Sequence, residues 1–498
     1  MTEVISNINS VINNFVWGIP MLVLLVGTGI LMTILTKVFQ LSHIGFWFKH
    51  TLGSIFTDKH ITKHTGKEDK SISQFQSLCT ALAATIGTGN IVGVATAIAT
   101  GGPGAIFWMW VVAFFGMMTN FSENVLGIYF RRKNDKGEWS GGPMYYLRDG
   151  LGAKKGFKHI GAVLAVLFSV FCLLASFGIG NMSQINSIAG NMKSAFNIPP
   201  FATGIFLMII AGLVIIGGIK RIAAVTEKFV PFMAILYVIG AVIVCIANID
   251  QTAAVFSSIF KGAFALRAVG GGIVGAGIKQ ALTWGMKRGV FSNEAGLGSS
   301  VMVHSSSNVK EPVRQGMWGI FEVFADTMIV CTLTAFVILS SGLVDLDTGK
   351  VISTASDSAL VGEAFAGVFG SFGPAFIAVA ILLFAFSTVL GWSHYGTKAF
   401  EYLFGTKATL VYRIVFIAVI FFGATMNLSL AWDLSDTFNG LMAIPNLIGV
   451  LSLSPIVMKI TKNYVKRHIK GQDIEPMLSA FPDIQKEQAE AVKEAPEL

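Results

Sequence analysis

The sequence predicts an all-α protein that crosses a membrane many times. Three observations predict this class: 53% of the 498 residues are hydrophobic, only 13% are charged, and the apolar residues gather in long runs. Soluble proteins carry about 25% charged residues, and an apolar run of about 20 residues can span a bilayer as a helix. The 54 glycines fit the same class, because Gly is commoner in membrane helices than in soluble ones.

By this length rule the chain contains eleven predicted transmembrane helices. They cover residues 15–36, 75–100, 104–130, 160–187, 201–219, 229–249, 273–304, 313–340, 374–400, 410–426 and 434–458. The segment ahead of the first helix has no basic residue, so no cleaved signal peptide is expected. The four cysteines all lie within apolar runs, and their spacing predicts neither a disulfide framework nor a metal site: Cys79, Cys172, Cys245 and Cys331.

The basic residues predict the orientation in the membrane. Most of the 36 Lys and Arg residues lie in alternate connections, at 37–70, 131–158, 220–228, 310–314, 398–413 and after 459. Because cytoplasmic loops are enriched in Lys and Arg, the N-terminus is expected outside and the C-terminus in the cytoplasm. This pattern accounts for the net charge of +8 without a nucleic-acid partner. The stretch 43–70 is expected either to be a solvated linker or to hold a short helix on the inner surface, and the acidic stretch 486–498 is expected to be disordered.

The second predicted helix contains an interruption at residues 83–93, which read Ala-Ala-Thr-Ile-Gly-Thr-Gly-Asn-Ile-Val-Gly. Gly87 and Gly89 flank Thr88, and Asn90 follows. Gly inside a helix costs about 1 kcal/mol relative to Ala, so two glycines at mid-membrane depth predict a break. Unwound backbone at that depth is tolerated where it lines a site inside the protein. Its free amide and carbonyl groups suit a small zwitterion and a dehydrated cation.

The seventh predicted helix is interrupted as well. Residues 277–300 are too polar and too rich in glycine for a helix that faces lipid. Ser292 and Asn293 are expected to cap a half-helix that begins near Glu294. Lys287 and Arg288 are expected to form a polar cluster with Glu294, because charges at membrane depth face a cavity or each other. The alternative is an ordinary exposed loop between two short helices.

Two interrupted helices five positions apart predict an inverted repeat. The first helix is treated as an addition, and the remaining ten form two sets of five. Each set begins with an interrupted helix, and the two sets cross the membrane in opposite directions. In such a repeat the substrate site is expected where the two breaks meet. The predicted divisions are an outer segment (1–14), the additional helix (15–36), a basic cytoplasmic linker (37–74), the first repeat (75–249), an outer loop (250–272), the second repeat (273–458) and a charged cytoplasmic tail (459–498).

Four stretches carry a resemblance to a known family. Residues 84–93 and 287–300, together with Ser-Gly-Gly-Pro-Met-Tyr-Tyr at 140–146 and Gln-Ala-Leu-Thr-Trp at 280–284, resemble the alanine/glycine:cation symporters of bacteria and archaea, the sodium:alanine symporters. The resemblance implies the leucine-transporter-like fold of the amino acid–polyamine–cation superfamily. It also implies inward co-transport of alanine or glycine with Na⁺ across the cell membrane, no organic cofactor, and function as a monomer.

The substrate-binding residues are predicted from the two breaks, the fourth helix and the ninth helix. The carboxylate of the amino acid should meet the backbone N–H groups near Thr88 and Gly89, and its ammonium the carbonyls near Phe291 and Ser292. Phe291, Trp392 and Gln184 would form a pocket with room for little more than a methyl group, although Trp392 could instead be an interface anchor. The full set is Gly87, Thr88, Gly89, Asn90, Gln184, Phe291, Ser292, Thr388 and Trp392. Near Gln184 three equally polar residues remain as alternatives: Asn181, Ser183 and Asn186.

The resemblance also implies two Na⁺ sites. One would use the Thr85 carbonyl, the Asn90 side-chain oxygen and Ser292. The other would use the carbonyls of Ala83 and Ile86 with the hydroxyls of Ser387 and Thr388. Asn90 could instead be a packing amide, and Ser387 and Thr388 could bond only to their own helix.

Three alternative functions can be compared with this one. A transporter of the same fold could use H⁺, or prefer a larger amino acid such as glutamine, and its candidate proton carriers are Glu123, Glu294, Glu322 and Asp326. An ion channel would need a symmetric pore, whereas this chain carries two unlike breaks. An enzyme is not expected, because the sequence lacks the His-Glu-x-x-His and Gly-x-Ser-x-Gly motifs.

Overall fold

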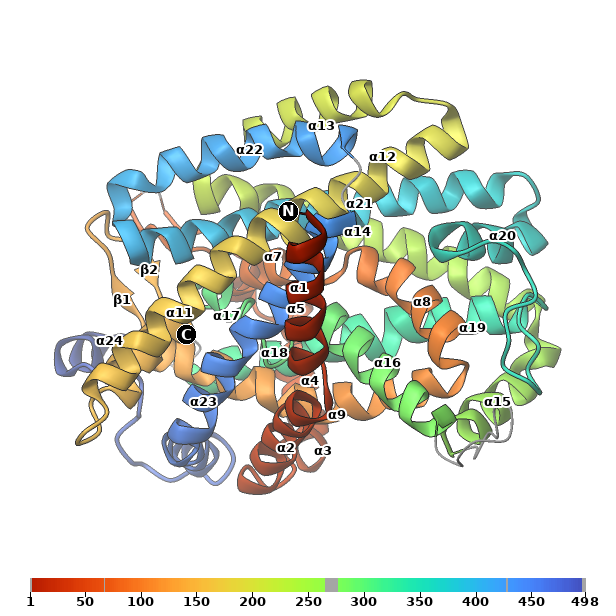
Figure 1. Cartoon of the computed structure of the whole chain (residues 1–498). Coiled ribbons are helices and arrows are strands. Elements are labelled where there is room, and N and C mark those ends of the chain that lie inside the picture. Colours follow the sequence, from red (N-terminus) through yellow and green to blue (C-terminus); the bar gives the residue numbers. More distant parts are fainter. Residues whose placement is uncertain (1, 67, 265–275, 427–428, 495–498) are drawn as a thin grey trace.

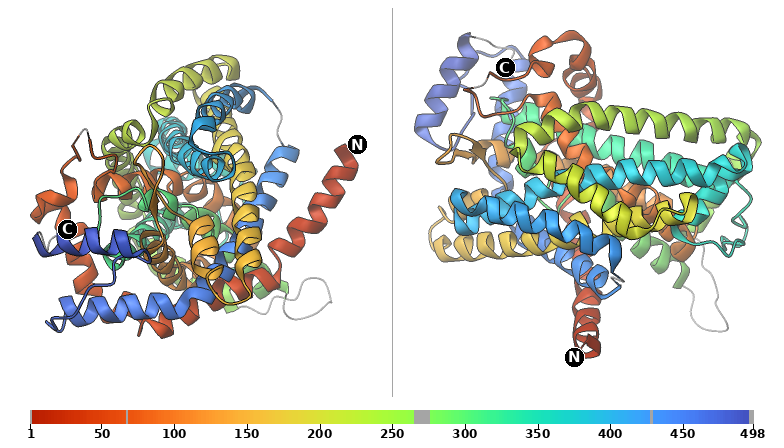
Figure 2. Two further views of the ribbon diagram at one scale, coloured as in Figure 1. Left: turned by 90° about the vertical axis from the view of Figure 1, so that its left-hand side faces the viewer. Right: turned by 90° about the horizontal axis from the view of Figure 1, so that it is seen from above.

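The computed structural model describes residues 2–66, 68–264, 276–426 and 429–494, and these residues are mostly helical (Figure 1). The exception is a two-stranded antiparallel ribbon of β1 (Arg132–Lys133) and β2 (Trp139–Ser140). Several long helices run between two ends of the molecule. One end carries α24 (Pro482–Glu494) and the other carries α20 (Asp357–Phe369), as Figures 1 and 2 show.

Eight helical segments of the described residues are long and apolar enough to cross a membrane. Three of them are single helices: α9 (Gly104–Tyr129), α14 (Gly218–Ala247) and α21 (Phe372–Phe404). Four are built from consecutive helices: Ser6–Leu35 from α1 (Thr2–Val16) and α2 (Ile19–Leu35), Lys158–Phe196 from α11 (Lys158–Phe177), η3 (Gly178–Met182) and α12 (Ser183–Phe196), Pro312–Ser340 from α18 (Pro312–Val323), η5 (Phe324–Cys331) and α19 (Thr332–Ser340), and Thr406–Thr425 from η6 (Thr406–Ala408) and α22 (Thr409–Thr425). The last, Asp433–His468, lies within α23 (Ser429–His468).

A ninth span is the bent pair of α7 (Gln74–Thr85) and η1 with α8 (Thr88–Asn90 and Val92–Gly101). The predicted number of eleven is therefore not confirmed. The two predicted spans that fall short are α13 (Pro200–Ile215), which is apolar but only 16 residues long, and α16 (Ala276–Asn293), which is polar. The order of the segments along the chain agrees with the prediction.

The remaining helices are short or lie at the two ends. They are α3 (Phe39–Ser42), α4 (Ile44–His50), α5 (Leu52–Thr57), α6 (Lys59–Thr62), α10 (Pro143–Tyr145), η2 (Tyr146–Leu151), η4 (Ile249–Gln251), α15 (Thr252–Phe264) and α17 (Val301–His304). Residues 37–74 thus hold four short helices, and their placement on the inner membrane surface stays a prediction.

The C-terminal tail differs from the prediction of disorder. Residues 482–494 form α24, and the chain before it returns to the ribbon end of the molecule. Ala480 N–H donates to the carbonyl of Tyr129 at 2.9 Å, and Lys133 pairs with Glu487 at 3.0 Å. Phe481 lies under the guanidinium of Arg132. The expectation of disorder is therefore wrong for residues 486–494, because contacts with Tyr129, Arg132 and Lys133 hold this part of the tail. Residues 495–498 lie outside the described part.

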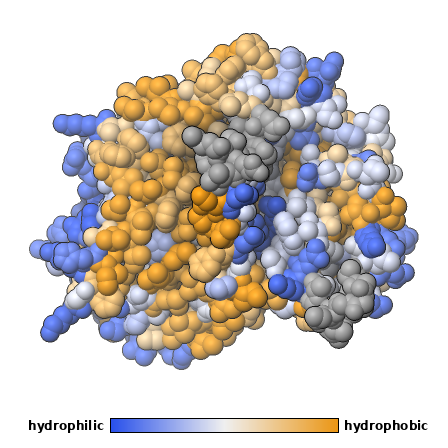
Figure 3. Space-filling model, in the orientation of Figure 1, coloured by the Kyte–Doolittle hydropathy of each residue, from blue (hydrophilic) through white to orange (hydrophobic). Residues whose placement is uncertain are grey.

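Buried and exposed helices are clearly separated. Every residue of α18 is buried, as is most of α7, and α9 packs against α16 and α18. By contrast, α13, α14 and α22 expose large apolar side chains such as Phe206, Phe232 and Val411. Figure 3 shows hydrophobic residues over much of one face with hydrophilic ones at its left edge and toward the right. Exposed apolar faces around a polar interior are typical of a protein embedded in lipid.

Candidate functional site

The interruption predicted in the second helix is present. Helix α7 ends at Thr85, η1 takes up Thr88–Asn90, and the axis bends by 59° before α8 continues. The Asn90 side-chain oxygen accepts the Gly87 N–H at 2.9 Å. Because this N–H would otherwise bond to the Ala83 carbonyl, the Asn90 side chain holds the break open and leaves that carbonyl without its helical partner.

The second interruption begins later than predicted. Ser292 and Asn293 are the last two residues of α16, and the unwound stretch is 294–300. The expectation that they cap a half-helix starting near Glu294 is wrong. The reason is the backbone of Glu294, Gly296 and Gly298, which has φ values of +56°, +92° and +74° and cannot continue a right-handed helix. After the break only the four-residue α17 follows.

The two breaks and α21 meet at the glycines. A Cβ atom added to Gly89 would lie 3.2 Å from Ser292 Cα and 3.3 Å from the Phe291 ring, and one added to Gly87 would clash with the Thr388 hydroxyl. Both glycines therefore provide room for neighbouring protein atoms, in addition to the predicted approach of a ligand. Segments more than 200 residues apart in sequence are brought into contact here.

A carboxylate that the sequence reasoning did not place in the site joins the two breaks. Asp326 Oδ1 accepts hydrogen bonds from Asn90 Nδ2 at 2.6 Å and from Ser292 Oγ at 3.1 Å. Asp326 is fully buried and lies on the π-helical η5. Sequence reasoning considered Asp326 only as a proton carrier. Its position in an apolar span was the available signal, because such charges usually mark a functional site.

The predicted ligands of the second ion site lie on two elements that face each other. Ile86 O loses its helical partner because Asn90 N–H bonds to the Gly87 carbonyl at 3.3 Å. The hydroxyls of Ser387 and Thr388 both donate to the Phe384 carbonyl, at 2.8 and 3.1 Å. These are the bonds expected if Ser387 and Thr388 bond only to their own helix. A hydroxyl that donates to its own helix still has lone pairs that can face a cation.

Gln184 is the polar residue of its region that reaches the first break. Its side-chain oxygen accepts the Thr88 N–H at 3.4 Å. The three alternatives bond elsewhere. Asn181 and Asn186 donate to backbone carbonyls of α22, and Ser183 donates to the carbonyl of Ile179 in the preceding turn. The π-helical η3 rotates the start of α12, which places Gln184 toward Thr88.

Trp392 links α21 to the second break. Its indole N–H donates to Glu294 Oε1 at 2.8 Å, and Glu294 Oε2 accepts a bond from Ser299. Only 1% of Trp392 is exposed, which rules out the role of an interface anchor. A Cβ on Gly180 would overlap the ring, so the orientation of Trp392 is set by close packing from η3.

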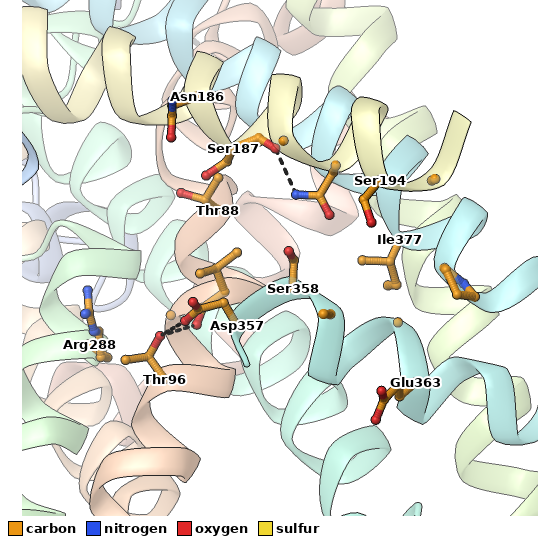
Figure 4. A pocket seen from close by; sticks show the side chains of 18 of the residues that line it. Thr88, Thr96, Asn186, Ser187, Ser194, Arg288, Asp357, Ser358, Glu363 and Ile377 are labelled. Atoms are coloured by element: carbon orange, nitrogen blue, oxygen red, sulfur yellow. Dashed lines mark hydrogen bonds between the residues drawn. The ribbon is translucent and has the colours of Figure 1, made fainter. Parts of the chain in front are cut away.

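A cavity of about 660 Å³ leads from this site toward the end that carries α20 (Figure 4). Thr88 and Phe291 line its inner part, together with Arg288. Its outer part is lined by polar residues of α12 and α20, including Asn186, Ser187, Ser194, Asp357, Ser358 and Glu363. A small polar solute can thus approach the two breaks from this end.

The charges of α16 do not form the predicted cluster. Lys287 pairs with Asp436 at 2.7 Å, whereas Glu294 bonds to Trp392. Arg288 lies beside the cavity with its guanidinium 5.3 Å from the Trp284 ring and 5.6 Å from the Phe291 ring. Among the described residues its Nε has no hydrogen-bond partner. The three charges diverge because they project from different sides of α16 and its end.

Packed polar residues occupy the molecule on the other side of the two breaks. His304 and Glu322 form a fully buried pair at 3.0 Å, and Arg131 donates to the carbonyls of Ser305 and Ser307. Glu123 accepts a hydrogen bond from Asn446. These bonds tie α9, α17, α18 and α23 together between the site and the end that carries α24.

Comparison with known proteins identifies the family. The family model described as the sodium:alanine symporter family matches residues 2–478. The chain belongs to this family. A sodium/alanine symporter of Methanococcus maripaludis is 45% identical over 468 residues, covering 93% of this chain and 97% of that protein. A probable sodium/glutamine symporter of Bacillus subtilis is 36% identical, covering 95% of this chain and 93% of that protein.

Family membership confirms the resemblance found in the sequence. It makes the chain a cation-coupled amino acid symporter rather than an enzyme. Among solved structures, MhsT in complex with L-phenylalanine matches 79% of this chain and 99% of its own, with 13% identity and a TM-score of 0.49. The division into two five-helix repeats therefore stays a prediction.

Proposed function

We propose that this protein imports small neutral amino acids, alanine and glycine, together with Na⁺ by alternating access. The observation that carries the proposal is the meeting of two helix breaks at Asp326, next to a cavity that is lined by Thr88 and Phe291 and extends toward α20. Symporters of inverted-repeat architecture bind substrate and ion where such breaks meet. The fold is proposed to be leucine-transporter-like, with two five-helix repeats and Ser6–Leu35 as the additional helix.

The first Na⁺ site is proposed to use Asp326 in addition to the residues predicted from the resemblance. Asn90 Nδ2 and Ser292 Oγ both bond to the Asp326 carboxylate, which brings two of the proposed ligand residues to one point. The Thr85 carbonyl and Asn90 Oδ1 would complete the set. A buried carboxylate is costly unless it is paired with a cation or hydrogen-bonded. A bound Na⁺ would therefore be stabilised by Asp326, and it would stabilise Asp326 in return.

The second Na⁺ site is proposed between the first break and α21. The carbonyls of Ala83 and Ile86 have lost their helical partners, and the hydroxyls of Ser387 and Thr388 retain free lone pairs. The close contact of Gly87 with Thr388 brings the two sets of oxygens together. An ion here would hold the broken helix against α21.

The substrate is proposed to bind beside the two breaks. Its carboxylate would take the N–H groups of Thr88 and Gly89, displacing the long hydrogen bond from Thr88 to Gln184. Its ammonium would meet the carbonyls of Phe291 and Ser292, because the C-terminal end of α16 carries a partial negative charge. The Phe291 ring lines the cavity, and together with Trp392 it would limit the side chain to a small group, which would favour alanine over glutamine.

The orientation is proposed from the basic residues. The end with α24 and the linker helices carries most of the Lys and Arg, so it would face the cytoplasm, and the cavity at α20 would open to the outside. The chain would then have its N-terminus outside and would be in an outward-open state, functioning as a monomer in a bacterial or archaeal cell membrane.

Uptake by purified protein in liposomes tests the function. Labelled alanine, glycine and glutamine are offered with an inward Na⁺ gradient, and with choline in place of Na⁺ at fixed pH. Uptake of alanine and glycine that requires Na⁺ is expected. Glutamine as the best substrate, or equal uptake in choline, would overturn the proposal.

A proton-coupled transporter of the same fold is the alternative. The observation that favours it is the buried His304–Glu322 pair, together with further carboxylates of the predicted set at Glu123 and Glu294. A Bacillus subtilis relative, 36% identical, is named a putative sodium/proton-dependent alanine carrier. A pH gradient that drives alanine uptake in the absence of Na⁺ would favour this alternative.

A further inference from the structure

A basic pocket lies where α2 ends beside the last turns of α23. It has a volume of about 210 Å³. Four lysines and one histidine line it, and no acidic residue does: Lys37, Lys462, Lys466, Lys470 and His43. The rest of the lining is mostly apolar and includes Leu35, Phe39, Met458 and Val465. This pocket is distant in sequence from every residue assigned above to substrate or Na⁺.

The positive charge of this pocket is not neutralised by any residue in the described part of the chain. Within the described ranges none of the four lysines makes an ion pair or a side-chain hydrogen bond. Their neighbours on α23 behave differently, since Arg467 and His468 bind Glu311 at 2.6 and 3.3 Å. Lys462 and Lys466 are four residues apart on a helix, a spacing at which like charges repel. An anion in the pocket would relieve that repulsion.

The turn after α2 shapes one wall of the pocket. Lys37 and Val38 have left-handed backbone, with φ values of 58° and 55°, and Val38 N–H donates to the Thr33 carbonyl at 2.7 Å. This turn inserts the fully buried Phe39 beneath the pocket, where its ring stacks on His43 at 4.8 Å. Burial lowers the pKa of His43, so at neutral pH the positive charge comes from the lysines.

The pocket lies at the boundary between apolar and polar surface. Next to it α2 and α3 expose Ile34 and Leu41, at 65% and 54% of their full areas. In a membrane these side chains contact hydrocarbon, while the lysines reach the headgroup region. A soluble anion could pair with the lysines but would leave this apolar surface uncovered.

We propose that this pocket binds the headgroup of an anionic phospholipid. The phosphate would lie between Lys462 and Lys466, and the acyl chains would extend along α2. Basic pockets at the cytoplasmic ends of membrane helices recognise anionic headgroups in this manner. Because α2 and α23 pack on each other, the bound lipid would join the additional helix to the second repeat.

Native mass spectrometry of the purified full chain with added phosphatidylglycerol tests this proposal. The variant carries Lys462→Gln, Lys466→Gln and Lys470→Gln. Its matched control removes the same charge at three lysines outside the pocket, with Lys155→Gln, Lys158→Gln and Lys407→Gln. We expect the first variant to lose at least about tenfold in lipid affinity, and the control to bind as the wild type does.

Three further measurements make the result decisive. The conservative triple variant to Arg keeps the charge and is expected to bind, which separates lost charge from misfolding. Phosphatidylcholine, which has no net charge, is expected to bind weakly to every form. Inorganic phosphate is expected not to compete. Equal binding by the two Gln variants would overturn the site, and full competition by phosphate would show a soluble anion instead of a lipid. Because the readout is lipid binding, failure of the proposed transport function leaves the test unaffected.

Discussion

The two breaks differ in how they are held open. In the first, the Asn90 side chain replaces one helical bond, and the interruption between α7 and α8 is short. In the second, residues 294–300 are unwound, and Glu294, Gly296 and Gly298 all have positive φ. The first break depends on a single hydrogen bond and close packing, whereas the second is built into the backbone. We therefore expect the first to respond to ion binding and the second to act as its fixed counterpart.

The largest expected effect is at the residue that joins the breaks. Asp326→Asn keeps the shape of the side chain but removes the charge proposed to stabilise Na⁺. We expect the apparent Na⁺ affinity in alanine uptake to fall by at least about 100-fold, since hydrogen bonds and pairing with a charged group contribute about 1.5–3 kcal/mol each. Glu363→Gln is the control, because this carboxylate lines the outer cavity away from the breaks. Unchanged Na⁺ dependence in Asp326→Asn would remove Asp326 from the site.

A methyl group at the first break is the next largest change. Gly87→Ala would push against the Thr388 hydroxyl, and overpacking costs about 1–3 kcal/mol, so uptake should fall by about tenfold to 100-fold. Gly190→Ala is the matched control, since it lines the same cavity and its added Cβ would meet no atom within 4 Å. The initial rates of alanine uptake by the two variants are compared at equal amounts of reconstituted protein. Equal rates would mean that the contact between Gly87 and Thr388 has no role in transport.

The pocket beside the second break should control substrate size. Phe291→Ala removes a ring that lines the cavity and contacts Gly89, so larger amino acids should become substrates. We expect the ratio of leucine to alanine uptake to rise by about tenfold. One or two methylene groups in an apolar pocket change the discrimination between substrates by a comparable factor. Phe386→Ala is a control with an aromatic residue of α21 outside the cavity. A substrate range that does not change would exclude Phe291 from the pocket.

The smallest expected effect concerns a region outside both breaks. Burial would raise the pKa of Glu311, but hydrogen bonds and charge from His468 and Arg467 outweigh it and hold the pKa below its usual value. A carboxylate whose pKa is lower in the folded than in the unfolded protein stabilises the fold at pH values above its pKa in the unfolded chain, about 4.3. This contribution is lost as the pH falls through the pKa of the folded state. Glu311→Gln should melt a few degrees below the wild type at pH 7.

The difference between the two melting temperatures should shrink below about pH 4. Thermal unfolding in detergent at several pH values measures it, with Glu363→Gln as a control for loss of one acidic residue. A constant difference across the pH range would contradict the assignment, since it would show that the ionised form of Glu311 contributes nothing.

Sequence reasoning located the first break correctly because its cause is local. Gly87, Gly89 and the Asn90 cap lie within four residues, and a pair of glycines at membrane depth favours unwound backbone that lines an interior site. Gln184 and Trp392 contact Thr88 and Glu294, one residue at each break, and their part in a substrate pocket stays a prediction. The second break was displaced because Glu294 adopts a left-handed conformation, which residue type does not reveal.

Other features depended on contacts between distant segments. The π-helical turn that aims Asp326 at Asn90 is invisible in a hydropathy pattern, so this carboxylate was considered only as a proton carrier. The tail was expected to be disordered because it is acidic, but Lys133 and Arg132 anchor it. Composition describes a segment alone, whereas its order depends on its neighbours.

The measurement that tests the central claim most directly is alanine binding to the purified protein as a function of Na⁺ concentration. It is made with the wild type and with Asn90→Ala, which removes the cap of the first break and a proposed ion ligand. We predict that Na⁺ increases alanine affinity in the wild type and that Asn90→Ala loses most of this increase. Alanine binding that is independent of Na⁺ in the wild type, or the same Na⁺ dependence in both proteins, would contradict the account.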